Sequence, residues 1–276
     1  MSASVEGSAT HATTFRTTRR NLEPVLLGTV GVLSLLAVWQ LIARVSSIPR
    51  YFFPSPADVV RAGIELVQKG ILPVYIADSL GRYLAGVSLG VSIGLILGLG
   101  IGMSPRLSRL LQPILNFFYA IVEVAWIPIF VIWWGYGLKT IVLALTYVVI
   151  FPVLFNTATA VRSTPRILIN AVSSLGATRM QVLRQVIFPG ALPGIITGIR
   201  IGAGFAFRGL IFAEMVAAKT GVGYLILTSA ANHATDRTIV GMIIIGLLWL
   251  MIDQLYLRPF EAATIERWGL VHDATE

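Results

Sequence analysis

The sequence lacks cysteine and contains few charged side chains. Only 12% of its 276 residues are Asp, Glu, Lys or Arg, whereas soluble globular proteins contain about a quarter. The absence of Cys excludes disulfides and any thiolate nucleophile or metal ligand, and three scattered His residues do not suggest a metal site. The low charge excludes a disordered chain, a coiled coil and an ordinary cytosolic enzyme.

Apolar residues dominate the chain instead. They make up 56% of it, and the mean hydropathy is +0.81. The net charge of +8 would suggest nucleic-acid binding in a soluble protein. In so apolar a chain, Lys and Arg in cytoplasmic loops explain it better. The composition therefore predicts an all-α, polytopic membrane protein that does not bind nucleic acid.

Apolar stretches long enough to cross a bilayer recur along the chain, since a spanning helix needs about 20 such residues. About six transmembrane helices are predicted, at 24–43, 75–103, 113–134, 138–161, 192–218 and 238–257. Glu123 and Pro128 interrupt the third. Residues 22–258 would form the membrane domain. Residues 1–21 read as a disordered cytoplasmic tail and 259–276 as a second cytoplasmic tail.

The distribution of Lys and Arg sets the orientation. With the N-terminus inside, the loops on that side carry more Lys and Arg, so both termini are predicted to be cytoplasmic. Arg19 and Arg20 also permit a twin-arginine signal, but the following apolar run is long for a signal, which favours an uncleaved first span. Residues 56–69 predict a short amphipathic helix on the outer surface, begun by Pro56.

Glycines recur every four residues in two of the predicted spans. Gly86, Gly90, Gly94, Gly98 and Gly102 form one row, and Gly190, Gly194, Gly198 and Gly202 form the other. Each row lies on one helix face and allows a second backbone to approach closely. Gly90, Gly94, Gly98, Gly198 and Gly202 are therefore predicted packing positions. The helices would either pack as a static bundle or move around a pathway.

Charged residues inside predicted spans are costly and often functional. Glu123 and Arg208 lie deepest; they would either pair with each other or line a translocation pathway, with Trp126 and Phe205 as aromatic surface. Glu214 lies near the outer end of its span, on the pathway or bracing the loop 219–223. Asp78 and Arg82 are four residues apart, a spacing that favours a helical ion pair.

The longest predicted cytoplasmic loop, 162–189, has a distinct pattern. It reads as a short helix, a break at Gly176, a second short helix and a stop at Pro189. Such an elbow would present a compact helical knob below the membrane, and a knob of this kind fits a groove on a soluble partner.

This loop resembles the EAA loop of ABC importer permeases, which runs Glu-Ala-Ala, three residues, Gly, nine residues, then Ile-x-Leu-Pro. Ala171, Gly176 and Pro189 match at the required spacing, whereas Asn170 replaces the Glu. Val172, Val186 and Phe188 also depart from the strict pattern.

The resemblance extends from about residue 52 to residue 270. Among these permeases, the chain is similar to the nitrate/sulfonate/taurine/bicarbonate branch. The segments that carry it are 53–56, 125–128, 132–137, 174–177, 213–215 and 221–225.

The resemblance implies a mechanism and its partners. Two copies of the chain would line one pathway in the bacterial inner membrane, two ATP-binding subunits would bind the knobs, and an extracytoplasmic solute-binding protein would deliver the solute. The residues that would couple to the ATPase are Asn170, Ala171, Leu175, Gly176, Ala177, Thr178 and Pro189. ATP and Mg²⁺ would bind the partner ATPase, because this chain lacks a Gly-x-x-x-x-Gly-Lys-Ser/Thr loop. The chain itself would have no catalytic residue, cofactor or metal.

The solute is predicted to be a small organic or inorganic anion. Arg208 would attract a carboxylate or sulfonate, or would be neutralised by Glu123 so that a polar uncharged solute fits. Two rival hypotheses are an ion-coupled secondary carrier with Glu123 or Asp78 as its proton site, and a structural membrane protein without solute flux.

Overall fold

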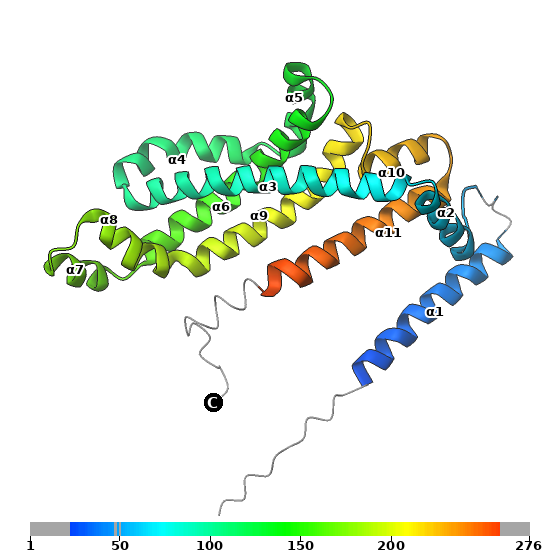
Figure 1. Cartoon of the computed structure of the whole chain (residues 1–276), viewed down its shortest axis with the longest axis horizontal. Helices are drawn as coiled ribbons and strands as arrows, with labels where there is room; N and C mark the ends of the chain where they lie inside the picture. The colour runs from blue at the N-terminus through cyan, green and yellow to red at the C-terminus, as the bar shows by residue number, and fades with distance from the viewer. Residues whose placement is uncertain (1–22, 47–48, 50, 260–276) are drawn as a thin grey trace, which may run out of the picture. The chain divides into compact units, whose positions relative to one another are not determined.

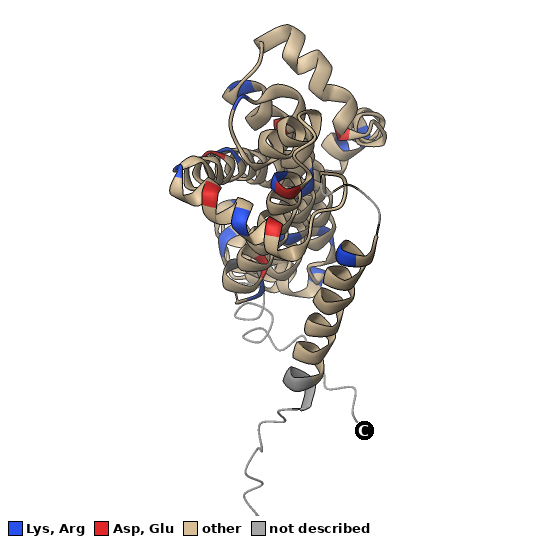
Figure 2. Ribbon diagram, turned by 90° about the vertical axis from the view of Figure 1, so that its right-hand side faces the viewer, with Lys and Arg blue, Asp and Glu red and all other residues tan. Residues whose placement is uncertain are grey.

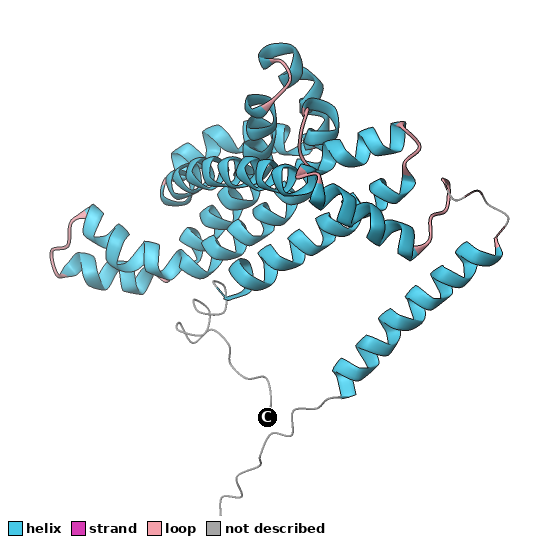
Figure 3. Ribbon diagram, turned by 45° about the vertical axis from the view of Figure 1, so that its right-hand side comes forward, coloured by secondary structure: helices cyan, strands magenta, loops and turns pink. Residues whose placement is uncertain are grey.

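The computed structural model describes residues 23–46, 49 and 51–259. Within these residues the chain is helical and contains no strand (Figure 3), which confirms the all-α prediction. The chain divides into two units, Met1–Ser47 and Ile48–Glu276. The predicted tails, 1–21 and 259–276, lie outside the described residues except for Pro259.

The first unit contains α1 (Glu23–Val45). Its segment Leu27–Val45 is long and apolar enough to cross a membrane, in agreement with the predicted first span at 24–43. The side chains of this segment are largely exposed within the unit, as expected for a helix whose apolar surface meets lipid or another protein.

The second unit is a bundle of helices joined by short turns (Figure 1). Its α-helices are α2 (Pro56–Gln68), α3 (Ile71–Met103), α4 (Pro105–Ala120), α5 (Trp126–Trp134), α6 (Leu138–Ser163), α7 (Arg166–Ser174), α8 (Arg179–Val182), α9 (Phe188–Ala217), α10 (Val222–Ala231) and α11 (Thr235–Ile252). Helices α7 and α8 lie at one end of the bundle, and α2 and α10 lie at the other (Figure 1).

Turn chemistry explains where several of these helices begin. Ser55 caps α2 in a capping box with Asp58, and Pro56 occupies the first turn, so the predicted outer amphipathic helix is confirmed as a helix. Gly70, with φ +70°, precedes α3. Ser104 ends α3 and caps α4. A polar residue or glycine therefore marks each of these boundaries.

The predicted third span, 113–134, is not one continuous helix. Its residues belong to α4, to the 3-10 turn η1 (Glu123–Ala125) and to α5, and the chain bends by 80° at the break between Ala120 and Glu123. Ile121 is extended, with φ −82° and ψ 119°. Pro128 lies in the first turn of α5, where a missing N–H leaves no helical bond unmade. The described residues thus contain five long candidate spans, or six if the bent pair counts as one.

Helix α6 forms the centre of the bundle, between α3 and α9. It is buried on most of its circumference, which explains why it is apolar all round. Both glycine rows face it. A Cβ atom built on Gly90 would lie 2.5 Å from the Cβ of Val149, and one on Gly198 would lie 2.8 Å from the Cβ of Asn156. The two glycine rows thus pack against a shared partner and not against each other.

Candidate functional site

The segment 162–189 forms a helical knob at one end of the bundle (Figure 1). Helix α7 ends at Ser174, and Gly176 follows with φ +84°, a left-handed conformation that favours glycine. Thr178 then caps α8 in a capping box with Gln181. The predicted order of helix, glycine break and second helix is therefore present.

Pro189 does not stop the second helix as predicted. Helix α8, the π-helical turn η2 (Leu183–Ile187) and α9 run on from one another, so that Arg179–Ala217 is one helical stretch of 39 residues. Pro189 lies in the first turn of α9, directly after η2. The wider π turn, in which Phe188 N–H bonds to the Leu183 carbonyl, changes the hydrogen-bond register where proline lacks a donor.

Most of the predicted coupling residues lie on the surface of the knob. Asn170, Ala171, Leu175, Gly176 and Thr178 are exposed, and Ala177 and Pro189 are half-buried. Leu175 is 87% exposed, at the tip. Other large apolar side chains of α7 and α8 are also exposed: Ile167, Leu168 and Met180. An exposed apolar surface of this kind is typical of a contact with another protein or with a membrane.

Arg208 lies on the face of α9 turned away from α6. The exposed side chains at helical spacing on this face are Ile201, Phe205, Arg208, Phe212 and Val216. The opposite face consists of the small residues Gly198, Gly202, Ala206, Gly209 and Ala213, which are buried. One guanidinium therefore lies in the middle of an otherwise apolar, open helix face.

Glu123 lines a pocket at the bend between α4 and α5. This pocket has a volume of about 190 Å³ and is lined by Tyr119, Ala120, Ile121, Val122, Glu123, Tyr147, Val148, Phe151, Pro152 and Phe205. Trp126 packs nearby, its ring centroid 5.4 Å from that of Tyr147. The structure thus brings Glu123, Trp126 and Phe205 into one aromatic region. Within the described residues, Arg208 and Glu123 do not form an ion pair with each other.

Glu214 is the centre of a buried polar network near the other end of α9. Its side chain is 1% exposed, and one carboxylate oxygen accepts a hydrogen bond of 2.7 Å from Arg82 of α3. Ser79 donates to the same carboxylate at 2.8 Å, and the backbone N–H of Gly223 donates at 3.0 Å. Glu214 therefore joins α3, α9 and the start of α10.

The same network fixes the loop 219–223, as predicted for Glu214. Arg82 donates to the carbonyl of Thr220 and to its hydroxyl, each at 2.7 Å. A Cβ on Gly223 would lie 2.8 Å from the Cβ of Glu214, so only glycine fits there. All the described contacts of the Glu214 carboxylate are with protein groups. A role for Glu214 in the pathway stays a prediction.

Sequence reasoning did not identify the main partner of Arg82. The predicted ion pair with Asp78 is present at 3.7 Å, but Glu214 lies closer and is far more buried. A second ionic cluster joins Asp253 to Arg200 at 3.3 Å and to Arg258 at 2.9 Å. Charged residues are otherwise sparse along the helices (Figure 2).

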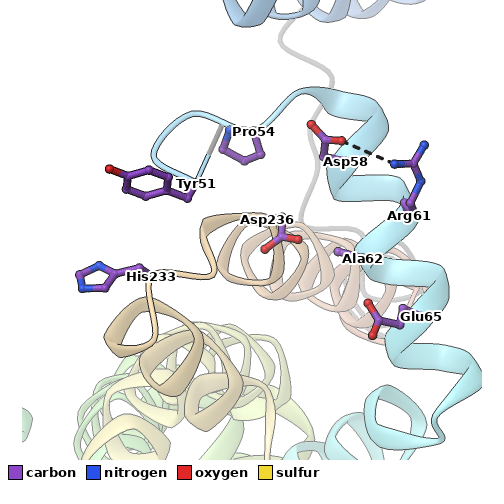
Figure 4. A pocket seen from close by; sticks show the side chains of 8 residues that line it. All are labelled: Tyr51, Pro54, Asp58, Arg61, Ala62, Glu65, His233 and Asp236. Atoms are coloured by element: carbon purple, nitrogen blue, oxygen red, sulfur yellow. Dashed lines mark ion pairs between the residues drawn. The ribbon is translucent and has the colours of Figure 1, made fainter. Parts of the chain in front are cut away.

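A polar pocket of about 340 Å³ lies at the end of the bundle opposite the knob (Figure 4). Its lining residues come from the segment before α2, from α2 and from the turn between α10 and α11: Tyr51, Pro54, Asp58, Arg61, Ala62, Glu65, His233 and Asp236. A hydrogen bond from Lys69 and the charges of Lys69 and Arg237 lower the pKa of Glu65. In the described part of the chain, no three His or acidic side chains converge to hold a metal ion.

Comparison with known proteins identifies relatives along most of the chain. It is 35% identical to the taurine transport system permease protein TauC of Escherichia coli, over 82% of this chain and 84% of the relative. It is 37% identical to the riboflavin transport system permease protein RibX of Chloroflexus aurantiacus, over 83% of this chain and 85% of the relative. The bicarbonate transport system permease protein CmpB of Synechococcus elongatus is 28% identical, over 91% and 92%.

The fold also matches that of solved transporters. A structure of the MetNI methionine ABC transporter in an inward-facing conformation has a TM-score of 0.61 at 22% identity, covering 71% of this chain and 97% of the matched chain. Residues 90–257 match the family described as binding-protein-dependent transport system inner membrane component. The chain therefore belongs to this family and is a multi-pass membrane permease of the ABC importer class.

Proposed function

We propose that the chain works as a homodimer in the bacterial inner membrane, powered by two separate ATPase subunits and supplied by an extracytoplasmic solute-binding protein. The observation that carries this proposal is the apolar knob of α7 and α8 at one end of a permease-family bundle. Both chain termini would lie in the cytoplasm, on the same side as the knob.

The knob suits a groove on a soluble ATPase for two reasons. Its tip exposes Leu175, its helices expose further apolar side chains, and burying them in a partner is favourable. The break at Gly176 and the capped start of α8 give the tip a defined shape. ATP and Mg²⁺ would bind the ATPase, and this chain would transmit ATP-driven closure through the helical stretch Arg179–Ala217.

The exposed face of α9 supports a second copy and an aqueous pathway. A charged side chain facing lipid at the bilayer centre costs at least about 2.5–3.5 kcal/mol. Arg208 is exposed in the single chain, so in the membrane it needs water or protein beside it. Two copies that face each other across a water-filled pathway would provide both.

The solute is proposed to be a small organic anion. Arg208 supplies a guanidinium suited to a carboxylate or sulfonate, while Phe205 and the aromatic pocket near Glu123 suit an organic body. Relatives named for taurine and aliphatic sulfonates agree with this chemistry. The relative named for riboflavin shows that the solute varies among similar chains. The translocation residues would be Glu123, Trp126, Phe205 and Arg208.

Purification of the tagged chain from its native membrane tests the assembly. We expect an ATP-binding subunit to copurify and the complex to hydrolyse ATP in a vanadate-sensitive manner. A homo-oligomer that retains solute uptake without any ATPase would instead support the ion-coupled carrier with Glu123 or Asp78 as its proton site. Absence of solute flux would support a structural role.

Gly176→Val should abolish ATPase association while the bundle stays folded. Its left-handed φ of +84° costs a residue with a Cβ about 1–2 kcal/mol, and the distorted tip would no longer fit its groove. Gly70→Val is a matched control. Gly70 also has a positive φ, of +70°, and a Cβ there would have no atom within 4 Å. It precedes the start of α3, at the end of the bundle away from the knob (Figure 1). Equal copurification of ATPase with both variants would contradict the coupling role.

Arg208→Gln should reduce solute uptake by about tenfold or more without changing complex assembly. The guanidinium would be lost from the pathway, whereas Arg208→Lys keeps a positive charge and should retain part of the uptake. Uptake by reconstituted vesicles and gel filtration of the complex measure the two effects. Unchanged uptake in Arg208→Gln would assign Arg208 to packing alone.

A further inference from the structure

A second large cavity lies at the knob end of the bundle, away from the pathway residues. It has a volume of about 660 Å³. It lies between the turn that joins α3 to α4 and the end of α6 with the start of α7. Its lining residues are Gly102, Met103, Pro105, Ser108, Arg109, Val161, Arg162, Thr164, Arg166, Ile169 and Ile187. The proposed function assigns no solute or ATPase contact to any of them individually, although Arg166 and Ile169 belong to the knob helix α7.

The charged side chains that line this cavity are all positive. Three arginines line it, Arg109, Arg162 and Arg166, and no carboxylate does. The sequence contains no Asp or Glu between Asp78 and Glu123, and none between Glu123 and Glu214. No acidic residue of α3 beyond Asp78, of α4, or of the stretch from α5 to the middle of α9 is therefore available to neutralise these guanidinium groups.

Two of the three arginines hydrogen-bond to the protein. Arg162 donates to the hydroxyl of Ser108 at 2.7 Å and to the carbonyl of Ile101 at 3.3 Å. Ser108 is itself buried. The Nε of Arg109 donates to the carbonyl of Pro105 at 3.4 Å, which leaves its terminal nitrogens for a ligand. Arg166 is the first residue of α7, and no side chain caps that helix, so its first N–H groups add to the positive potential.

The rest of the lining is apolar. Met103, Val161, Ile169 and Ile187 combine a hydrocarbon surface with the basic groups. The cavity also lies where the candidate spanning helices α3 and α6 end, and helices of this length end at or just beyond the lipid headgroups. Basic pockets between membrane helices bind anionic lipid headgroups. A free phosphate ion would gain nothing from the apolar surface.

We infer that this cavity binds an anionic phospholipid, with its phosphate diester between Arg109, Arg162 and Arg166 and its first acyl carbons against the apolar lining. The bound lipid would screen three like charges beside the knob and hold the start of α7 against the ends of α3 and α6. It would thereby make the position of the knob depend on the lipid composition of the membrane.

Native mass spectrometry of the purified full-length chain tests this inference. The protein is titrated with phosphatidylglycerol, with phosphatidylcholine of the same acyl chains, or with inorganic phosphate. Each arginine near a headgroup contributes a factor of about five in affinity. We expect Arg109→Gln/Arg166→Gln to bind phosphatidylglycerol about 25-fold more weakly than the unsubstituted chain, and Arg109→Lys/Arg166→Lys to retain most of the affinity.

Arg106→Gln/Arg179→Gln is the matched control. It removes the same charge from α4 and α8, at exposed arginines that do not line the cavity, and should retain the affinity. An equal loss in this control would overturn the site in favour of diffuse surface charge. Equal binding of phosphatidylcholine, or occupancy by inorganic phosphate that excludes the lipid, would also overturn it. Circular dichroism confirms that each variant is folded.

Discussion

Glu214→Ala is expected to lower the free energy of unfolding by about 3–5 kcal/mol, because it leaves a buried charge without its partner. Arg82 is 11% exposed, and Glu214 is its closest ionic partner, at 2.7 Å. The variant also removes the acceptor for Ser79 and for the backbone N–H of Gly223. Thermal unfolding of the purified protein in detergent measures the loss.

Asp78→Ala provides the matched control for Glu214→Ala. Asp78 contacts the same arginine, but at 3.7 Å and with a side chain that is 40% exposed. An exposed pair of this kind contributes about 0–1 kcal/mol. In addition, Arg82→Met combined with Glu214→Leu should recover much of the stability, since no buried charge remains unpaired. Equal losses in Glu214→Ala and Asp78→Ala would show that the buried network does not stabilise the fold.

The features that could be predicted from sequence are those with a local cause. Apolar length predicted the spanning segments, Pro56 predicted the start of α2, and Gly176 predicted the break in the knob. Helical spacing gave the Asp78–Arg82 pair. Each of these depends on residues within one or two helical turns.

Features that depend on contacts between distant segments were missed. The Arg82–Glu214 pair joins residues 132 positions apart, and the sequence offers no spacing rule for such a pair. The bend at 121–125 was indicated only by Glu123 and Pro128, and its 80° angle depends on packing. The short helix α10 is apolar but too short to span a membrane, so a search for spanning segments does not identify it.

The glycine rows combine a local pattern, which the sequence reveals, with a contact between distant segments, which it does not. Their four-residue period identified a face of close approach, but not the partner helix. The structure shows that α6 meets both rows through its own side chains, among them Val149 and Val153. Because these residues are branched at Cβ, they need glycine opposite if the helix axes are to lie close.

Gly90→Val is expected to lower the free energy of unfolding by about 3 kcal/mol or more, the upper range for overpacking a close contact. A Cβ at this position would lie 2.5 Å from the Cβ of Val149 and 2.9 Å from the carbonyl oxygen of Thr146. The clash with the carbonyl cannot be relieved by a side-chain rotation, so α3 and α6 must separate. Thermal unfolding in detergent and the yield of folded protein measure the effect.

Gly81→Val is the matched control, on the same helix. A Cβ on Gly81 would have no atom within 4 Å, and replacing glycine within a helix favours the helix by several tenths of a kcal/mol. This variant should therefore unfold at or slightly above the original temperature. If Gly90→Val is equally stable, the close approach of α3 and α6 is not required for folding. If it is unstable while Gly81→Val is not, the glycine row is needed for its contact with α6 and not for backbone flexibility.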